Sequence, residues 1–367
     1  MDQQWTIDTE LGEVLQQNEE QLAREIAAAI AEGIKLQYLP AQRPALRDAH
    51  SKAHGCVQAD FQVEKDLPPH LAQGVFVPGR NYPALIRFSN GVADPMRPDA
   101  KRDARGMAIK LLTVLGDKIL PEERDAETQD FIMINHPTFF VDDAARYLAL
   151  HHVASTNKVV RMVRSAWLLG WKGAFIAFKN TSSKIASPLE TRYWSMTAYR
   201  LGDPPHKQAI KFSARPCLPA TTTIPSHPTR SFLRETMIKQ LAAGEARFDF
   251  EVQPRTSPAM SVERSMVEWK EADAPFVKVA TITIPRQQFA TPERDQFGEN
   301  LSFTPWHALP QHRPLGAVNR MRRVIYQEIS KLRHELNGTP RREPSDLDDD
   351  KALGRLSREV IAAHEGR

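Results

Sequence analysis

The sequence predicts an α+β fold in which eight β-strands close into a barrel and helices surround it. Eight segments have apolar residues that alternate with polar ones or run together, and each segment ends at turn residues. The chain also contains 27 prolines, a frequency that suits many short elements joined by fixed turns. Eight strands are the number that a small closed barrel needs to hold side chains or one ligand.

The chain begins with a predicted helix over residues 11–37, which we interpret as a packing arm that occupies residues 1–40. Its apolar residues recur at steps of three to seven positions between acids and glutamines, the pattern of an amphipathic helix. They are Leu15, Leu22, Ile26, Ile30 and Ile34.

The remaining elements follow from changes of period along the chain. Strands are predicted over residues 56–64, 84–91, 106–116, 130–135, 192–202, 208–216, 246–254 and 276–285. Helices are predicted over 142–178, with a break near 155–157, and over 230–243 and 317–336. Because Asn337, Gly338 and Pro340 end the last helix, the polar residues 338–367 are predicted to form a mobile tail.

The composition excludes several classes of protein. With 41% hydrophobic and 26% charged residues the chain can bury a core, which excludes wholesale disorder. The most apolar run, residues 166–178, contains Lys172 and is shorter than the roughly 20 residues of a membrane span. Acids stand at the amino terminus where a signal peptide has basic residues, and Cys56 and Cys217 are the only cysteines. We therefore expect a cytoplasmic protein with no membrane span.

The charge pattern argues against a nucleic-acid partner. The net charge of +4 comes from 49 basic and 45 acidic residues that are mixed along the chain. No stripe of Lys and Arg interleaved with aromatic residues occurs at the spacing that would follow a nucleic-acid groove, so we expect a mixed, solvated surface and no nucleic-acid binding.

The first group of residues that could carry chemistry is RDAHSKAHG, which contains Arg47, His50 and His54 just ahead of the first strand. The two histidines have the i, i+4 spacing of a zinc-binding helix. However, no glutamate follows His50, Gly55 interrupts a helix at once, and no third ligand is indicated. Zinc is therefore not expected, and polar loop residues remain the simple alternative.

The second group is IRFSNG followed by KRDARGMAIK. Arg87 and Ser89 lie on one predicted strand, and Arg102 and Arg105 bracket Asp103. Guanidinium groups near a barrel interior are costly unless they meet carboxylates, which indicates an anionic ligand inside. Salt bridges at the surface are an equal alternative for this segment.

The third group is NRMRRVIYQE, in which Arg322 precedes Tyr326 by four residues, so both project from one face of the last helix. A neighbouring guanidinium and a ferric ion would favour the phenolate form of a tyrosine, which is the chemistry of a tyrosinate haem ligand. Simple packing of an Arg and Tyr pair is the alternative for this spacing alone.

The order of these groups, with NHPTFF between the second and the third, resembles that of the haem catalase family over about residues 47–333. In its length the chain resembles a small catalase-related peroxidase that lacks the C-terminal domains of larger members. The resemblance implies an antiparallel eight-stranded catalase-type β-barrel, a proximal C-terminal helix, and haem b held within residues 41–337.

The resemblance also implies a role for each matching residue. His50 would be the distal acid and base, Ser89 the hydroxyl that steadies it, and Asn135 the amide that orients the substrate. Tyr326 would be the axial ligand of the haem iron, kept ionised by Arg322. The remaining contacts to haem would come from Arg47, Arg87 and Phe140.

The chain departs from the family pattern in three places. INHPTFF is one residue shorter than the family's segment with two asparagines, so Asn135 is the match and His136 an insertion at the edge of the pocket. His54 has no counterpart in large catalases and would rival His50 if the loop shifted. Because the chain ends soon after the proximal helix, we expect no NADPH and a more open pocket.

The resemblance implies a haem-dependent catalase or peroxidase that decomposes hydrogen peroxide, and organic hydroperoxides with a reducing donor. One alternative is a fatty-acid hydroperoxide-converting enzyme of the allene oxide synthase type. There a threonine precedes the distal histidine, whereas this chain has Ala49. The other alternative is a haem carrier or peroxide sensor, which has no need of the proton shuttle that His50 and Ser89 would form. A homodimer or higher homo-oligomer is the expected assembly.

Overall fold

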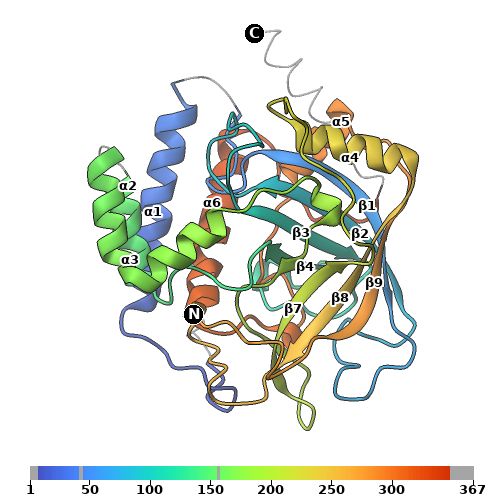
Figure 1. Cartoon of the computed structure of the whole chain (residues 1–367). Helices are drawn as coiled ribbons and strands as arrows, with labels where there is room; N and C mark the ends of the chain where they lie inside the picture. The colour runs from blue at the N-terminus through green and yellow to red at the C-terminus, as the bar shows by residue number, and fades with distance from the viewer. Residues whose placement is uncertain (1–6, 41–43, 155–157, 348–367) are drawn as a thin grey trace.

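The computed structural model describes residues 7–40, 44–154 and 158–347 (Figure 1). All of its named strands pair antiparallel in one sheet, in the order β5-β4-β3-β2-β1-β9-β8-β7-β6. A further pairing of β5 with β7 closes the sheet into a barrel. The strands are β1 (Ala53–Val63), β2 (Asn81–Asn90), β3 (Arg105–Leu112), β4 (Thr128–Ile134), β5 (Tyr193–Trp194), β6 (Tyr199–Leu201), β7 (Gln208–Pro216), β8 (Ala246–Pro254) and β9 (Val277–Ile284).

Strands β5 and β6 are one predicted strand that is interrupted. Between them Met196 has a φ of 62°, and the Ser195 hydroxyl donates to the Thr197 carbonyl at 2.8 Å. These local bonds turn the chain out of the ladder, so that β5 pairs with β4 and β7 whereas β6 pairs with β7. Counted as one interrupted strand, the pair gives a closed antiparallel barrel of eight strands, and the predicted fold is confirmed.

Aromatic side chains fill the interior of the barrel. The ring of Phe131 lies 4.9 Å from that of Phe250 and 5.1 Å from that of Phe212, between centroids. Phe61 meets Phe250 edge-on at 5.1 Å, and all four rings are buried. Because tightly packed rings leave no room for a large ligand, a haem-sized group must lie at the outside of this barrel.

Helices cover one side and one end of the barrel. Figure 1 shows α6 running along the barrel, α1 packed against α6, and α2 with α3 outside α1. Ile26, Ile30 and Ile34 of α1 share one buried cluster with Met321 and Ile325 of α6. The helices are α1 (Glu19–Tyr38), α2 (Ala144–Ala154), α3 (Lys158–Thr181), α4 (Phe232–Ala243), α5 (Pro292–Asn300) and α6 (Ala317–Leu336), with short 3₁₀ turns η1 (Pro121–Glu123), η2 (Pro188–Glu190) and η3 (Pro310–His312).

The predicted start of the first helix is wrong, because α1 begins at Glu19 and not at residue 11. The preceding segment is held instead by ion pairs to the start of α6. The buried guanidinium of Arg320 donates to Glu13 at 2.7 Å, to Glu19 at 2.6 Å and to Glu263 at 2.9 Å. Glu13 also accepts from the backbone N–H of Gly316 at 2.8 Å, which holds the non-helical residues 13–16 against the start of α6.

Part of the predicted tail lies against the barrel. The carboxylate of Glu343 accepts from the buried ammonium of Lys110 at 2.6 Å, and the carbonyl of Leu347 accepts from Gln58 at 3.0 Å. Residues 338–347 are therefore packed where a mobile tail was expected, because Lys110 needs a second carboxylate beside Asp130. Residues 348–367 lie outside the described part of the chain. Over the described residues, no helix combines the length and the apolar character of a membrane span.

Candidate active site

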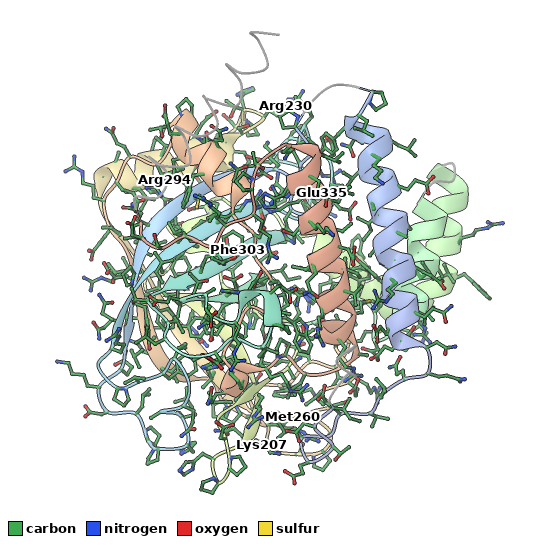
Figure 2. All side chains as sticks on the ribbon, turned by 180° about the vertical axis from the view of Figure 1, so that it is seen from behind. Lys207, Arg230, Met260, Arg294, Phe303 and Glu335 are labelled. Atoms are coloured by element: carbon green, nitrogen blue, oxygen red, sulfur yellow. The ribbon has the colours of Figure 1, made fainter. Side chains whose placement is uncertain are left out.

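The predicted site residues lie where the barrel wall faces α6. β2 carries Arg87 and Ser89, and α6 carries Arg322 and Tyr326. Figure 2, seen from behind, shows α6 between the barrel and α1. Arg87 of β2 and Arg322 of α6 both act on the pKa of His50, so residues more than 200 positions apart in the sequence lie near one another.

His50 is held in an unusual backbone conformation next to β2. Its φ is 59°, its N–H donates to the carbonyl of Gly91 at 3.1 Å, and its own carbonyl accepts from Arg87 at 2.9 Å. The Nδ1 atom lies 3.0 Å from the Oγ of Ser89. A Cβ on Gly106 of the adjacent strand would lie 2.5 Å from this Nδ1, so a glycine is required for the ring to fit.

The surroundings of His50 keep its imidazole neutral. Burial lowers its pKa to about 4, and the positive charges of Arg87, Arg322 and Arg47 act in the same direction. A neutral imidazole at pH 7 can accept a proton, whereas an imidazolium cannot. Arg322 belongs to α6, so His50 and this helix share one electrostatic environment.

His54, the second residue of β1, occupies a different environment, inside a polar network with Asn90 and Asp99. Its Nε2 lies 3.0 Å from the amide oxygen of Asn90, and its Nδ1 lies 3.8 Å from Asp99. The amide of Asn90 also donates to Asp99, at 2.9 Å. Burial lowers the pKa of His54 to about 3. The structure thus places His50, and not His54, beside Ser89.

Arg105 belongs to this same network. Its guanidinium donates to Asn90 and, at 2.8 Å, to the carbonyl of Asp99. The alternative of salt bridges at the surface does not describe Arg105, because its buried guanidinium bonds to the interior of the protein itself.

Three arginines surround one carboxylate at the end of β2. Glu299 accepts from Arg47 at 2.6 Å and from Arg87 at 3.2 Å, and Arg333 lies 3.6 Å away. Burial raises the pKa of Glu299, but the three guanidinium groups outweigh it and lower that pKa below its usual range. The Nε of Arg87 is buried and has no hydrogen-bond partner among the described residues. The cluster therefore has an excess of positive charge and suits further carboxylates.

Sequence reasoning missed Glu299 and Arg333. Arg333 follows Tyr326 by seven residues, which is about two helical turns, so it lies on the same face of α6. That spacing could have identified Arg333. Glu299 ends the polar helix α5 and offers no comparable signal, because only the fold brings it to Arg47 and Arg87.

Arg322 and Tyr326 contact each other as their spacing predicts. The Nη2 of Arg322 donates to the Tyr326 hydroxyl at 3.1 Å, and its Nη1 donates to Asn319 at 3.2 Å. Burial lowers the pKa of Arg322, but Tyr326 and Tyr199 raise it further, so the net shift is upward. A permanent cation beside the phenol oxygen favours the phenolate when a metal binds there.

Asn135 is bound to the start of β3 and to the segment after α3. Its Oδ1 accepts from the N–H of Arg105 at 2.7 Å, and its Nδ2 donates to Ser183 at 2.9 Å. His136 is buried, and its Nδ1 contacts Thr138 while its Nε2 has no partner within the described ranges. Asn135 lies beside the strand that contacts His50, but its amide is largely engaged by the protein.

Phe140 lies in an aromatic group beside α2. Its ring centroid is 4.4 Å from that of Phe139 and 6.1 Å from that of Tyr147. Burial raises the pKa of Tyr147, and the charge of Asp48 acts in the same direction.

These residues fit a haem. Tyr326 offers a phenol oxygen beside a guanidinium, which is the donor of a ferric tyrosinate. Arg47, Arg87 and Arg333 offer a surplus of cations and one unpartnered donor to a group that carries carboxylates. His50 stands in a gap that Gly106 keeps free of a side chain.

A second cluster has the composition of a metal site but is already compensated. The ligand atoms of Glu123, His307 and Glu343 lie within 4.8 Å of one another. However, Lys110 donates to Glu343, and Arg341 pairs with Glu123. Two cations therefore already occupy the neighbourhood that a metal ion would need.

A hollow of about 800 Å³ lies away from His50, between the last turns of α6 and residues 338–341. It is lined mainly by polar and charged side chains such as Glu122, Lys331 and His334. Neither His50 nor Tyr326 lines it, so we place the candidate site at the paired residues and not at this hollow.

Comparison with known proteins identifies relatives of this chain. The catalase family model matches residues 32–181. A catalase-related peroxidase of Mycolicibacterium paratuberculosis is 25% identical over 298 residues, which cover 79% of this chain and 90% of that protein. A catalase of Latilactobacillus sakei is 31% identical over 114 residues, 31% of this chain and 21% of that protein.

The solved structures that resemble this one support the same fold. A fungal catalase superposes with a TM-score of 0.64 at 16% identity, covering 95% of this chain and 73% of that one. Catalase A from Saccharomyces cerevisiae superposes with a TM-score of 0.59 at 14% identity, covering 95% and 75%. At such low identity the superposition establishes the shared barrel and its helices.

Proposed function

Because this chain belongs to the catalase family and is an enzyme of that class, we propose that it decomposes hydrogen peroxide with haem b. Two molecules of hydrogen peroxide would yield oxygen and two of water. With an organic donor that gives two electrons and two protons, one peroxide would yield two of water. The observation that carries the proposal is the Tyr326 hydroxyl held 3.1 Å from the Arg322 guanidinium.

In this proposal the haem lies between the barrel wall and α6, within the unit formed by residues 41–337. Tyr326 would bind the iron, and Arg47, Arg87 and Arg333 would meet the propionates. Phe140 would contact the macrocycle. When bound, the haem supplies the redox chemistry of iron that the side chains lack.

His50 would move the proton. Its neutral imidazole takes a proton from one peroxide oxygen and returns it to the other, the work of a general base and acid. Ser89 holds Nδ1 at 3.0 Å and so orients the ring, and Arg87 holds the His50 carbonyl. Asn135 would bond to the substrate with the part of its amide that the protein leaves free.

An absorption spectrum of the purified protein, recorded before and after hydrogen peroxide is added, tests the proposal. We expect a Soret band of high-spin ferric haem with tyrosinate, and consumption of peroxide. Oxygen release measures catalase activity, and oxidation of an added phenolic donor measures peroxidase activity.

Other outcomes separate the alternatives. Rapid conversion of a fatty-acid hydroperoxide without a donor, together with no turnover of hydrogen peroxide, would favour the allene oxide synthase type. A haem-loaded protein inert to all peroxides would favour a carrier or sensor. Failure to bind haem after reconstitution would overturn the proposal.

A further inference from the structure

Helix α3 exposes four large aromatic side chains on the outside of the molecule. Trp167 is 81% exposed, Trp171 86%, Phe175 62% and Phe178 61%. We call these four residues the aromatic face. Large aromatic side chains usually lie inside folded proteins or at their interfaces, so a row of four on one helix requires an explanation.

The backbone of α3 turns these side chains outward. Gly170, with φ 64° and ψ 173°, kinks the helix between the two tryptophans. After the kink, Trp171, Phe175 and Phe178 follow at steps of four and three, which places them on one face.

The opposite face of this second half of α3 packs against the protein. Ile176 is buried, and a Cβ on Gly173 would lie 3.3 Å from both Met266 and the carbonyl of Phe140. The packing that fixes α3 therefore leaves the aromatic face in solvent. Figure 1 shows α2 and the first half of α3 beyond α1, and the second half of α3 running from there towards the barrel.

The positive charge of α3 indicates that its partner is anionic. The segment Lys158–Thr181 contains five basic residues and no acidic one, and the side chains of Arg164 and Lys179 are exposed. Lys179 follows Phe175 by one turn, so its ammonium borders the aromatic face. Tryptophan and phenylalanine beside lysine and arginine on an amphipathic helix are the composition of a helix that lies in an anionic membrane interface.

A second copy of this chain fits the face less well. At about 150–250 Å² per fully exposed aromatic side chain, the exposed fractions of these four rings offer roughly 430–730 Å², below the about 800 Å² per partner of a stable protein interface. A two-fold contact would also bring the basic residues of α3 against their own copies, which is repulsive. An anionic bilayer offers the opposite charge and an apolar layer of any extent.

We propose that α3 binds the surface of bilayers rich in anionic phospholipid, with the aromatic face at the level of the headgroups. The inference rests on α3 alone and is independent of haem binding. The full chain is mixed with vesicles of equal parts phosphatidylglycerol and phosphatidylcholine, or of phosphatidylcholine only, and the bound fraction is measured by flotation. We expect at least tenfold stronger partitioning onto the anionic vesicles and release at high salt.

The variants are chosen on exposed positions so that folding is preserved. Trp171→Ser with Phe175→Ser should reduce binding to anionic vesicles at least tenfold. Leu115→Ser with Leu218→Ser is the matched control, because these leucines are 70% and 77% exposed on other segments, and it should bind like the wild type. Arg164→Glu with Lys179→Glu should also reduce binding, whereas Lys65→Glu with Lys239→Glu, exposed elsewhere, should have less effect.

A spectroscopic readout distinguishes insertion from adsorption. Brominated phosphatidylglycerol should quench the tryptophan fluorescence of the wild type more than that of Trp167→Phe with Trp171→Phe. Equal binding by the wild type and the aromatic variant would overturn the proposal. So would a wild-type dimer that the aromatic variant converts to monomers while neither binds vesicles, because the face would then join two copies of the chain.

Discussion

The Nδ1 of His50 lies 3.0 Å from the Oγ of Ser89, and both atoms lie close to Gly106 on the neighbouring strand. This pairing leaves Nε2 as the ring nitrogen that is free to exchange protons with a substrate. The position depends on a missing side chain, because a Cβ at residue 106 would lie 2.5 Å from Nδ1 and 2.8 Å from the serine oxygen.

Gly106→Ala should therefore displace the His50 ring and reduce peroxide turnover, while Tyr326 on the other side still binds haem. We expect a loss of at least tenfold in turnover per haem, measured by stopped-flow absorbance. Gly33→Ala is the control, because a Cβ added there would meet no atom within 4 Å. In the middle of α1 it should gain roughly 0.5–1 kcal/mol of stability without a change in turnover. Normal turnover in Gly106→Ala would contradict the role of the pair.

His50→Ala should affect the reaction rate, whereas His54→Ala should affect the stability of the protein. The first removes the proton carrier and should slow the reaction with peroxide by roughly 10²–10⁴-fold with haem retained. The second removes a buried partner of Asn90 and should lower the free energy of unfolding by about 1–3 kcal/mol. Stopped-flow kinetics and urea denaturation of both variants separate the two effects, and slowing confined to His54→Ala would reject His50 as the base.

Tyr326→Phe should lose most of its haem, because the phenol oxygen that α6 carries beside Arg322 is removed. The ratio of Soret to protein absorbance after purification measures the loss. Tyr82→Phe, near the other end of β2 from Ser89, should retain a wild-type ratio. An unchanged absorption spectrum in Tyr326→Phe would contradict the assignment of Tyr326 as the axial ligand.

Stability should fall in acid because of His312, which is buried between Phe76 and Phe131 with ring centroids 5.1 and 6.0 Å away. Burial lowers its pKa to about 3. An unfolded histidine binds a proton below about pH 6.5 but the folded one does not, so His312 removes about 1.4 kcal/mol of stability per pH unit as the pH falls from 6.5 towards 3.

Urea denaturation between pH 6 and pH 4.5 checks this effect. The dependence of unfolding free energy on pH should be less steep in His312→Gln by about 1.4 kcal/mol per pH unit. Phe76→Leu also destabilises the core but keeps the histidine, so its slope should equal that of the wild type. Equal slopes in all three proteins would show that His312 is not neutral in the fold.

Glu343→Gln should destabilise the protein, because it removes one of two carboxylates that neutralise the buried Lys110. We expect a loss of about 1–3 kcal/mol in urea denaturation, since Asp130 remains. Adding Lys110→Met to Glu343→Gln should cost less than the sum of the two single changes, because the buried charge is gone. Strict additivity would mean that the ion pair does not form.

The sequence was sufficient to predict the barrel, because alternating apolar and polar residues and terminal turn residues mark each strand. It was insufficient where a contact from far along the chain decides the local structure. Residues 11–18 have apolar spacing suited to a helix, yet they form turns and irregular chain, because the bonds of Glu13 to Gly316 and Arg320 hold this segment against α6. The helix Pro292–Asn300 was missed because it is polar almost throughout and starts from the cap that Thr291 provides.

The same limit applies to the candidate site. Motif spacing was enough to predict that Arg322 contacts Tyr326, since both lie one turn apart on one helix. It could not indicate that Glu299 joins Arg47 and Arg87, because that cluster exists only when α5 meets the end of β2.

The anchoring of Arg320 by Glu13, Glu19 and Glu263 ties the orientation of α6 to the first twenty residues of the chain. Arg320 lies six positions before Tyr326, so any rotation of the helix that moved the phenol oxygen would also break these ion pairs. A fragment that begins at residue 32, where the family match starts, would lack two of the three carboxylates and leave a buried guanidinium undercompensated. The shortest fragment that keeps Tyr326 in its orientation therefore begins before Glu13. That position lies ahead of the segment that matches the family.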